Sequence, residues 1–315
     1  MSFRRLAWSV VGLAFPVIAW GAVVRATGSG AGCGNTWPTC DGELLPLASS
    51  TEQLIELSHR LSSGVFGLVV VALAVAARRS FPPGHTVRKL AWLTLTLTGV
   101  EALLGAGLVR FEQVADNAEV SRAFWISGHL VNTMLLLAAA FATAWFATHA
   151  DRRYERTPRT LVTGAVALLI VGMSGAITAL GDTLFPAASF VEGLRSELSV
   201  TAGVFERLRV AHPILAVATA VGIILLVRAR GLAVGSSPAE DVAGRGAANR
   251  TGGGRTLVLV LSLQLAIGVV NVLLAAPIWM QVVHLLVADL VWVIYLRVVL
   301  EESTVSAPIV SMSAR

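Results

Sequence analysis

The chain of 315 residues is 55% hydrophobic and only 14% charged, with a mean hydropathy of +0.75. Soluble domains of this length rarely carry so few charges, so the composition excludes a soluble enzyme and predicts an all-α membrane protein. The net charge of +5 is then explained by membrane topology rather than by binding to nucleic acid.

Eight apolar stretches approach the length of about 20 residues that an α-helix needs to cross a bilayer. They predict transmembrane helices over residues 6–24, 53–77, 90–109, 121–148, 160–180, 206–227, 256–275 and 279–300. The first stretch follows Arg4 and Arg5 as a signal peptide would, but its length suits a retained span. Residues 232–254 are rich in Gly, Ala, Ser and Arg and lack periodicity, so they predict a flexible cytoplasmic linker.

Most of the 24 Lys and Arg residues fall at the chain ends and in the loops after even-numbered spans, whereas acidic residues gather in the opposite loops. The positive-inside rule therefore places both termini in the cytoplasm. A multi-pass protein of the bacterial cytoplasmic membrane is expected.

An internal repeat divides the chain into halves, residues 1–150 and 151–315. Gly21-Ala-Val-Val near the end of the first span corresponds to Gly175-Ala-Ile-Thr near the end of the fifth. Histidines follow at nearly the same offset, in the pairs His59 with His212 and His129 with His284. Because four spans return the chain to its starting side, the pattern predicts two parallel four-helix bundles.

The four repeated histidines lie on even-numbered spans, each about two helical turns from the outer end. A lone intramembrane histidine is often a buried side chain that is hydrogen-bonded to a neighbour, but four at one depth favour a common role. Two imidazoles from non-adjacent helices can supply both axial ligands of a haem iron. Two haem sites near the outer face, one in each half, are expected, whereas His85 and His149 fall in basic loops and need no role.

The first outer loop contains both cysteines, Cys33 and Cys40, on either side of Trp37-Pro38. They face an oxidising compartment, where a disulfide can persist as a structural staple or take part in redox chemistry. A zinc site is poorly supported, because neither cysteine has a further thiol or histidine at ligand spacing.

Glu56 precedes His59 by three residues, so both project from one face of their helix. The carboxylate could orient the imidazole, occupy the wet end of the helix or act in proton transfer. Arg209 occupies the equivalent position before His212, so the halves are chemically unequal. The first haem site is suited to chemistry, and the second to a permanent haem whose propionates need counter-charges.

Other polar residues in or near the spans are each expected to make a specific contact. Several arginines near the outer boundary suit haem propionates, with headgroup contact as the alternative; they are Arg25, Arg60, Arg207 and Arg209. Glu101 and Asp289 are expected to form interior hydrogen bonds. Gln281, three residues before His284, is a candidate partner of that ring.

Together these segments resemble the haem A synthases of bacterial and mitochondrial membranes. The resemblance covers essentially the whole chain and is carried by Arg25-Ala-Thr-Gly-Ser-Gly, Gly32-Cys33, Trp37-Pro38, Cys40, Gly42, Glu56-Leu-Ser-His59-Arg60, Gly128-His129-Leu-Val-Asn132 and the two later histidines. Residues 183–206 contain no cysteine, so a second disulfide found in some relatives is excluded here.

The resemblance implies an enzyme that oxidises a methyl group of haem O to a formyl group by successive hydroxylations, giving haem A for terminal oxidases. It implies substrate haem between His59 and His129 with Glu56 as the catalytic residue, and resident haem b between His212 and His284. It also links Cys33 and Cys40 in a disulfide that is structural or redox-active.

The expected partners are membrane lipid, an electron donor, the preceding haem O synthase and oxidase assembly factors, and self-association into a homo-oligomer stays open. A di-haem cytochrome b that only transfers electrons is the main alternative, and a haem or small-molecule transporter is a weaker one. A prenyltransferase would need aspartate-rich motifs for a magnesium diphosphate, and the chain contains no Asp-x-x-x-Asp sequence.

Overall fold

The computed structural model describes residues 1–47, 49–197, 199, 203–232 and 246–306. Within them the chain is almost entirely helical, and eight of its helices are long and apolar enough to span a membrane. The helices are α1 (Phe3–Ala26), α2 (Thr51–Ser80), α3 (Thr86–Arg110), α4 (Val120–Thr148), α5 (Arg159–Leu184), α6 (Phe190–Glu197), α7 (Val204–Ala229), α8 (Gly246–Leu273) and α9 (Ile278–Ser303). The all-α, eight-span prediction is confirmed, with bounds that extend the expected spans by several residues at most ends.

Four short elements were not predicted. The one-turn 3₁₀ helix η1 (Ser29–Ala31) lies in the first outer loop, and α6 is an amphipathic helix between α5 and α7. Strands β1 (Arg152–Tyr154) and β2 (Thr304–Ser306) pair antiparallel, which ties the connection between the halves to the end of α9. Such short segments carry too little periodicity to be recognised from sequence.

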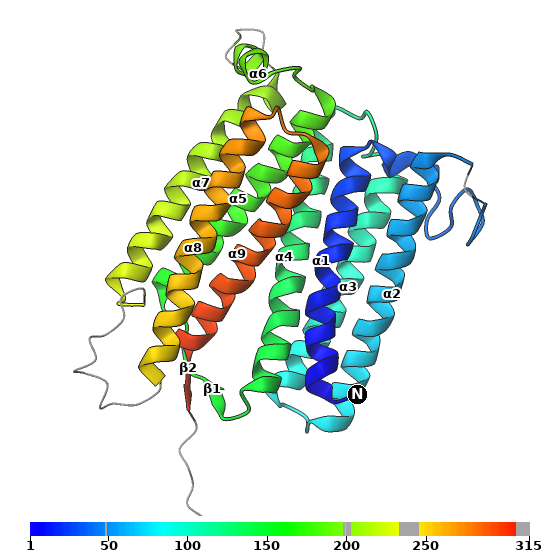
Figure 1. Ribbon diagram of the computed structural model, residues 1–315. Coiled ribbons are helices and arrows are strands. Elements are labelled where there is room, and N and C mark those ends of the chain that lie inside the picture. Colours follow the sequence, from blue (N-terminus) through cyan, green and yellow to red (C-terminus); the bar gives the residue numbers. More distant parts are fainter. Residues whose placement is uncertain (48, 198, 200–202, 233–245, 307–315) are drawn as a thin grey trace, which may run out of the picture.

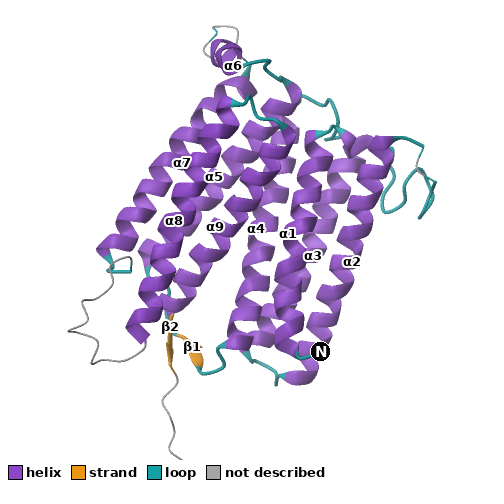
Figure 2. Cartoon of the chain, viewed as in Figure 1, coloured by secondary structure: helices purple, strands orange, loops and turns teal. Residues whose placement is uncertain are grey.

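The helices of the two halves form two groups side by side (Figures 1 and 2), and the contacts within each group close a ring of four. In the first half α1 contacts α2, α2 contacts α3, α3 contacts α4, and α4 returns to α1. In the second half α5, α7, α8 and α9 repeat this order of contacts. Helices α1 and α4 meet α5 and α9 between the rings. This is the arrangement expected for two parallel repeated bundles.

The expected linker at 232–254 is shorter than predicted at its C-terminal end. Helix α8 already begins at Gly246, and residues 233–245 lie outside the described part of the chain.

Among the described residues, the largest cluster of buried apolar side chains runs through both halves and across the interface between them. Trp292 on α9 donates its indole N–H to the Met134 carbonyl oxygen on α4 at 2.8 Å. Gly172 on α5 faces Met134 from the other side, where a Cβ would lie 2.9 Å from the sulfur atom. Small and large side chains therefore interlock across the interface.

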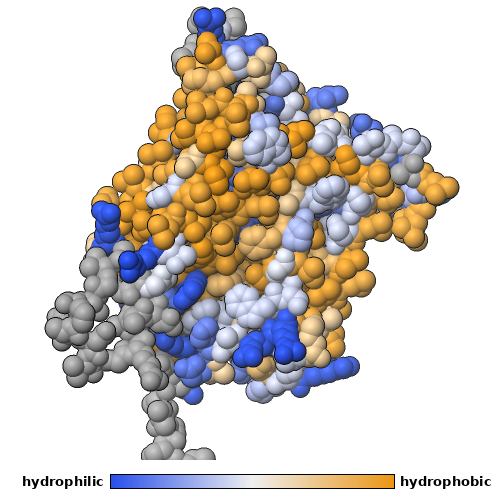
Figure 3. All heavy atoms as spheres, viewed as in Figure 1, coloured by the Kyte–Doolittle hydropathy of each residue, from blue (hydrophilic) through white to orange (hydrophobic). Residues whose placement is uncertain are grey.

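Other apolar side chains face outward. Figure 3 shows apolar residues over much of the lateral surface, while hydrophilic residues gather toward the two ends. Leu68 on α2 and Leu259 on α8 are more than two-thirds exposed, at 71% and 70%. In a soluble protein such a surface would drive aggregation, whereas in a bilayer it meets acyl chains.

Candidate haem sites

The four predicted histidines lie on the second and fourth helices of the two halves. Each ring packs against a glycine on the preceding helix, at a place where a Cβ would come close to the imidazole Cε1. The pairs and these distances are Gly21 with His59 (3.0 Å), Gly105 with His129 (3.9 Å), Gly175 with His212 (3.0 Å) and Gly268 with His284 (3.1 Å). The four rings thus occupy equivalent places in the repeat, and at three of them an alanine would press on the ring.

The second-half pair has a geometry that fits one haem. The ring centroids of His212 and His284 are 6.4 Å apart, and the ring planes are nearly perpendicular at 87°. An imidazole nitrogen binds a metal at about 2.0 Å, and the ring centroid lies about 1 Å behind it, so two rings on opposite sides of one ion are about 6 Å apart. The residues present therefore fit axial ligation of a haem iron.

Ser174 on α5 fixes the tautomer of His212. Its hydroxyl donates to the Val171 carbonyl oxygen at 2.8 Å and lies 3.0 Å from His212 Nδ1. Because the hydroxyl hydrogen is already used, Ser174 accepts from Nδ1–H. The lone pair of His212 Nε2 is then available for a metal, as in other histidine ligands oriented by a neighbouring acceptor.

The partner of His284 is Gln264 on α8, not the predicted Gln281. The Gln264 amide nitrogen lies 3.3 Å from His284 Nε2 and donates to the His284 carbonyl oxygen at 3.1 Å. Gln281 accepts from Arg25 at 2.7 Å and donates to the Ala276 carbonyl oxygen at 2.7 Å. Spacing along one helix suggested Gln281, but its amide is taken by groups on other elements.

In the first half, His59 and His129 are close enough for a charge on one ring to disfavour a charge on the other. His59 Nδ1 is buried and has no hydrogen-bond partner within the described residues. Trp20 occupies the position in α1 that corresponds to Ser174 in α5, and its indole N–H donates to Ser58 instead, at 2.9 Å. The hydroxyl that orients His212 therefore has no counterpart beside His59.

His129, in contrast, lies beside a carboxylate. Oε1 of Glu101 on α3 lies 3.5 Å from His129 Nδ1. Asn132 donates to Glu101 Oε2 at 2.5 Å, and the Thr133 hydroxyl donates to Oε1. The interior hydrogen bonds expected for Glu101 are confirmed, and its place beside a predicted ligand was missed. Aligning the third helices of the halves would have found it, since Glu101-x₃-Gly105 and Gln264-x₃-Gly268 are parallel motifs.

Glu56 joins the first outer loop to α2. It is only 3% exposed; Oε2 accepts from the Cys33 backbone N–H at 2.8 Å, and Oε1 accepts from Arg60 Nε at 3.1 Å and from Arg60 Nη2. Cys33 and Cys40 form a disulfide, in agreement with the resemblance. Arg60 Nη1 also donates to the Thr36 and Thr39 carbonyl oxygens at 2.7 and 2.6 Å. Glu56 and Arg60 thus clamp the disulfide loop onto α2.

The loop packs tightly against the start of this helix. A Cβ on Gly32 would lie 2.5 Å from the Glu52 carbonyl oxygen, so only glycine permits this approach. Ser50 caps α2 by accepting from the Gln53 N–H at 3.1 Å, and the Gln53 side chain donates to Asp41 at 2.8 Å. The N-terminal end of α2, about two turns from His59, is therefore held by the loop.

Two further arginines predicted to meet propionates have protein partners. Arg25 on α1 donates to the Ala179 carbonyl oxygen (2.6 Å) and the Thr183 hydroxyl (2.8 Å) on α5, and to Gln281 on α9. It therefore bridges the two halves. The propionate contact stays a prediction.

Arg209 is buried near the end of α5. Its Nη2 donates to the Phe185 carbonyl oxygen at 2.8 Å, and its Nη1 lies 3.5 Å from Asp182 and 3.9 Å from Glu197. Its Nε has no hydrogen-bond partner within the described residues. Propionate binding by Arg209 also stays a prediction.

The interior hydrogen bond expected at Asp289 is not observed for its Oδ2. This residue of α9 is 4% exposed, and Oδ2 has no partner in the part of the chain that the structure describes. Trp292, a buried donor one turn further along α9, donates to Met134 instead.

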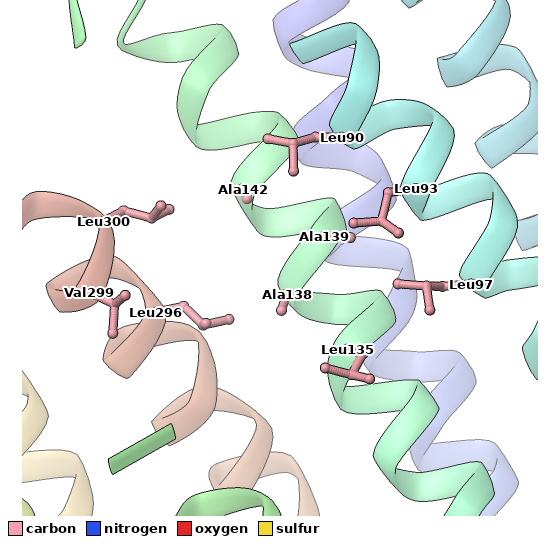
Figure 4. Close-up of a pocket in the computed structure, with 10 residues that line it drawn as sticks. All are labelled: Leu90, Leu93, Leu97, Leu135, Ala138, Ala139, Ala142, Leu296, Val299 and Leu300. Atoms are coloured by element: carbon pink, nitrogen blue, oxygen red, sulfur yellow. The ribbon is translucent and has the colours of Figure 1, made fainter. Parts of the chain in front are cut away.

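An apolar groove of about 370 Å³ lies between α3, α4 and α9, lined only by Leu, Ala and Val side chains (Figure 4). Leu97 from α3, Ala138 from α4 and Leu296 from α9 contribute to it. The Leu97 carbonyl oxygen accepts from Asn132 at 2.9 Å, and Asn132 also holds Glu101. The groove therefore begins beside the hydrogen-bond network around His129.

Comparisons with known proteins agree with this architecture. A family model described as COX15-CtaA, cytochrome oxidase assembly protein, matches residues 4–296. The chain is 42% identical over 301 residues to a protein of Thermus thermophilus named protoheme IX farnesyltransferase, in an alignment that covers 92% of this chain and 48% of the relative.

Two proteins named haem A synthase match shorter stretches. The one from Alkalihalophilus pseudofirmus is 38% identical and the one from Halalkalibacterium halodurans 40% identical, each over 121 residues, or 38% of this chain and 40% of the relative. The alignments thus span about half of the Thermus protein and two-fifths of each of these. With a match over nearly its whole length, the chain belongs to the COX15-CtaA family of cytochrome oxidase assembly proteins.

Proposed function

We propose that the chain is a haem A synthase, which oxidises a methyl group of haem O to the formyl group of haem A. The observation that carries this is the unequal pairing of the histidines: His129 stands beside the Glu101 carboxylate, whereas His212 and His284 have neutral partners and a separation that suits one haem. An electron carrier with two similar haems needs no such inequality. The names of the relatives point to the same pathway.

In this proposal the first half binds the substrate. His59 and His129 hold the iron of haem O, and the apolar groove beside Asn132 and Leu97 receives its isoprenoid tail. Two successive hydroxylations convert the methyl group to a hydroxymethyl group and then to a geminal diol, which loses water to give the aldehyde. Electrons and the oxidant come from outside the chain.

Glu56 is the proposed catalytic residue of this half. Arg60 donates to its carboxylate one helical turn from His59, which suits stabilisation of positive charge or acceptance of a proton from the substrate. The same carboxylate anchors the Cys33 amide, so the disulfide loop and the substrate site are coupled through one side chain.

The second half holds a resident haem b. His212 and His284 are its proposed ligands, and Ser174 keeps the His212 tautomer that ligation needs. When bound, this haem would supply one-electron redox chemistry to the substrate half. Arg209 is the proposed propionate contact, through the Nε that has no partner within the described residues.

The surroundings of the protein follow from the same proposal. The matched Thermus relative is about twice as long as the aligned region and is named for farnesyl transfer to protohaem. A haem O synthase that passes its product directly to this chain is therefore the proposed partner, together with oxidase assembly factors. We place the protein in the bacterial cytoplasmic membrane with the histidines toward the outer face.

The test is to purify the chain from cells with and without a supply of haem O and to identify the extracted haems by mass spectrometry. The proposal expects haem B in both cases and, with the supply, haem O, a hydroxylated intermediate or haem A. Haem B alone at two haems per chain, unchanged by the supply, would contradict it and favour an electron-transfer cytochrome.

A further inference from the structure

The third helices of the two halves, α3 and α8, carry the same motif with one chemical difference. Glu101 lies four residues before Gly105, and Gln264 lies four residues before Gly268. Each glycine faces the histidine of the following helix, His129 or His284. The repeat therefore places a carboxylate beside one predicted ligand and a neutral amide of similar size beside the other.

The contacts around the carboxylate are specific to the first half. Asn132 and Thr133, on the turn of α4 that follows His129, both donate to Glu101. Repeat positions equivalent to these two residues are Val287 and Ala288 on α9, which have no side-chain donor. The carboxylate is thus held in place by a set of donors that the second half lacks.

The hydrogen-bonding state of His129 Nδ1 indicates what this arrangement does. His129 Nδ1 is buried and has no hydrogen-bond partner within the described residues, and the carboxylate at 3.5 Å is an acceptor close to it. A small rotation of the ring would let Nδ1–H donate to Glu101. The proton would then stay on Nδ1, leaving the Nε2 lone pair free to bind iron.

We propose that Glu101 is a positioning residue that holds His129 as an iron ligand and makes it a stronger electron donor than its counterpart His284. An anionic acceptor strengthens a histidine ligand because it stabilises positive charge on the ring. At His284 the Gln264 amide nitrogen is a donor that faces Nε2, and Nδ1 has no hydrogen-bond partner within the described residues. This difference stabilises the oxidised iron in the first half relative to the second. The inference rests on the proposed function for the identity of the haem in the first half.

The consequence is a difference in reduction potential between two sites that otherwise share ligands. A lower reduction potential in the first half means that its oxidised state is favoured, which suits the half in which the substrate is oxidised. In the second half, the Ser174 hydroxyl is a neutral acceptor at His212 and the Gln264 amide nitrogen lies against His284 Nε2, so neither partner carries the charge that would lower the potential.

The experiment uses the full chain purified with haem O supplied, and compares Glu101→Gln with the reciprocal Gln264→Glu. Spectroelectrochemical titration follows each haem, and the first-half haem is identified as the one lost in a His59→Ala variant. Glu101→Gln is expected to raise the potential of the first-half haem and to leave the other unchanged. Gln264→Glu is expected to lower the potential of the second-half haem.

Affinity gives a second readout. Loss of a group that orients a ligand histidine costs about 10- to 100-fold in affinity, so Glu101→Ala should weaken first-half haem binding by this factor. Glu101→Asp keeps the charge and should restore a potential closer to wild type than Glu101→Gln does. Rescue by charge rather than by size separates positioning of the ligand from simple packing.

The outcomes are distinguishable. An unchanged first-half potential in Glu101→Gln, or equal shifts of both haems, would overturn the inference, as would a first half that holds no haem in the wild type. If the first half holds haem B rather than haem O, the proposed function fails while the same titration still decides the role of Glu101.

Discussion

Removal of the Glu56 carboxylate should release the disulfide loop from α2. Glu56 accepts three hydrogen bonds, one from the Cys33 amide and two from Arg60, at a site where the two charged side chains are only 4% and 11% exposed. In Glu56→Ala the buried guanidinium keeps only its contacts to the Thr36 and Thr39 carbonyl oxygens. Breaking a buried ion pair from one side costs about 3 to 5 kcal/mol.

Local opening of the loop can be measured through its disulfide. If the substitution destabilises the closed loop by about 3 kcal/mol relative to the open loop, the open population rises roughly 100-fold, since 1.4 kcal/mol is a factor of ten. The Cys33–Cys40 bond should then be reduced by a thiol reagent roughly 100 times faster in Glu56→Ala than in wild type. Reduction is followed by alkylation and mass spectrometry in detergent.

Two variants control this experiment. Glu52 is an exposed acid in the first turn of the same helix, and Glu52→Ala should change the rate by less than about threefold because only a dipole interaction is lost. Glu56→Gln keeps an acceptor for the Cys33 amide and should protect the disulfide better than Glu56→Ala, while product formation is lost. A reduction rate in Glu56→Ala within twofold of wild type would refute the clamp, and full activity in Glu56→Gln would refute the catalytic role.

Three further predictions follow from contacts in the structure. Ser174→Ala removes the acceptor for His212 Nδ1 and should weaken retention of the resident haem by about 10- to 100-fold, measured as the rate of haem loss to apomyoglobin; unchanged retention would argue against the tautomer assignment. Arg25→Ala breaks three hydrogen bonds between the halves and should cost about 2 to 4 kcal/mol, seen as a lower thermal midpoint in detergent, and an unaltered midpoint would count against the bridge. Ala138→Trp fills the apolar groove and should weaken binding of haem O but not of haem B, whereas Leu61→Trp on the outer surface of α2 should change neither; equal effects on both haems would rule out the groove as a tail site.

Much of the fold follows from periodicity and composition, because the bilayer imposes length and polarity on every span. The eight spans, the repeat and the four histidines all come from patterns along the chain. The small elements α6, β1 and β2 leave no such pattern, and α8 begins earlier than the polar sequence before it suggested.

The partners of the histidines were harder to predict. Spacing of three or four residues identifies neighbours on one helix, but the contacts observed at His129, His212 and His284 come from the preceding helix of the bundle. Glu56 shows the same limit: it was expected beside His59, and its oxygens are taken by Arg60 and the Cys33 amide instead. Such choices depend on which helices pack together, which a single helix does not encode.

The division of labour between the two histidine pairs is tested most directly by the haem content of four single variants, purified with haem O supplied. His212→Ala and His284→Ala should lose haem b and retain the capacity to bind haem O. His59→Ala and His129→Ala should retain haem b at one haem per chain and contain neither haem O nor haem A. Loss of the same haems from both pairs of variants would contradict the account.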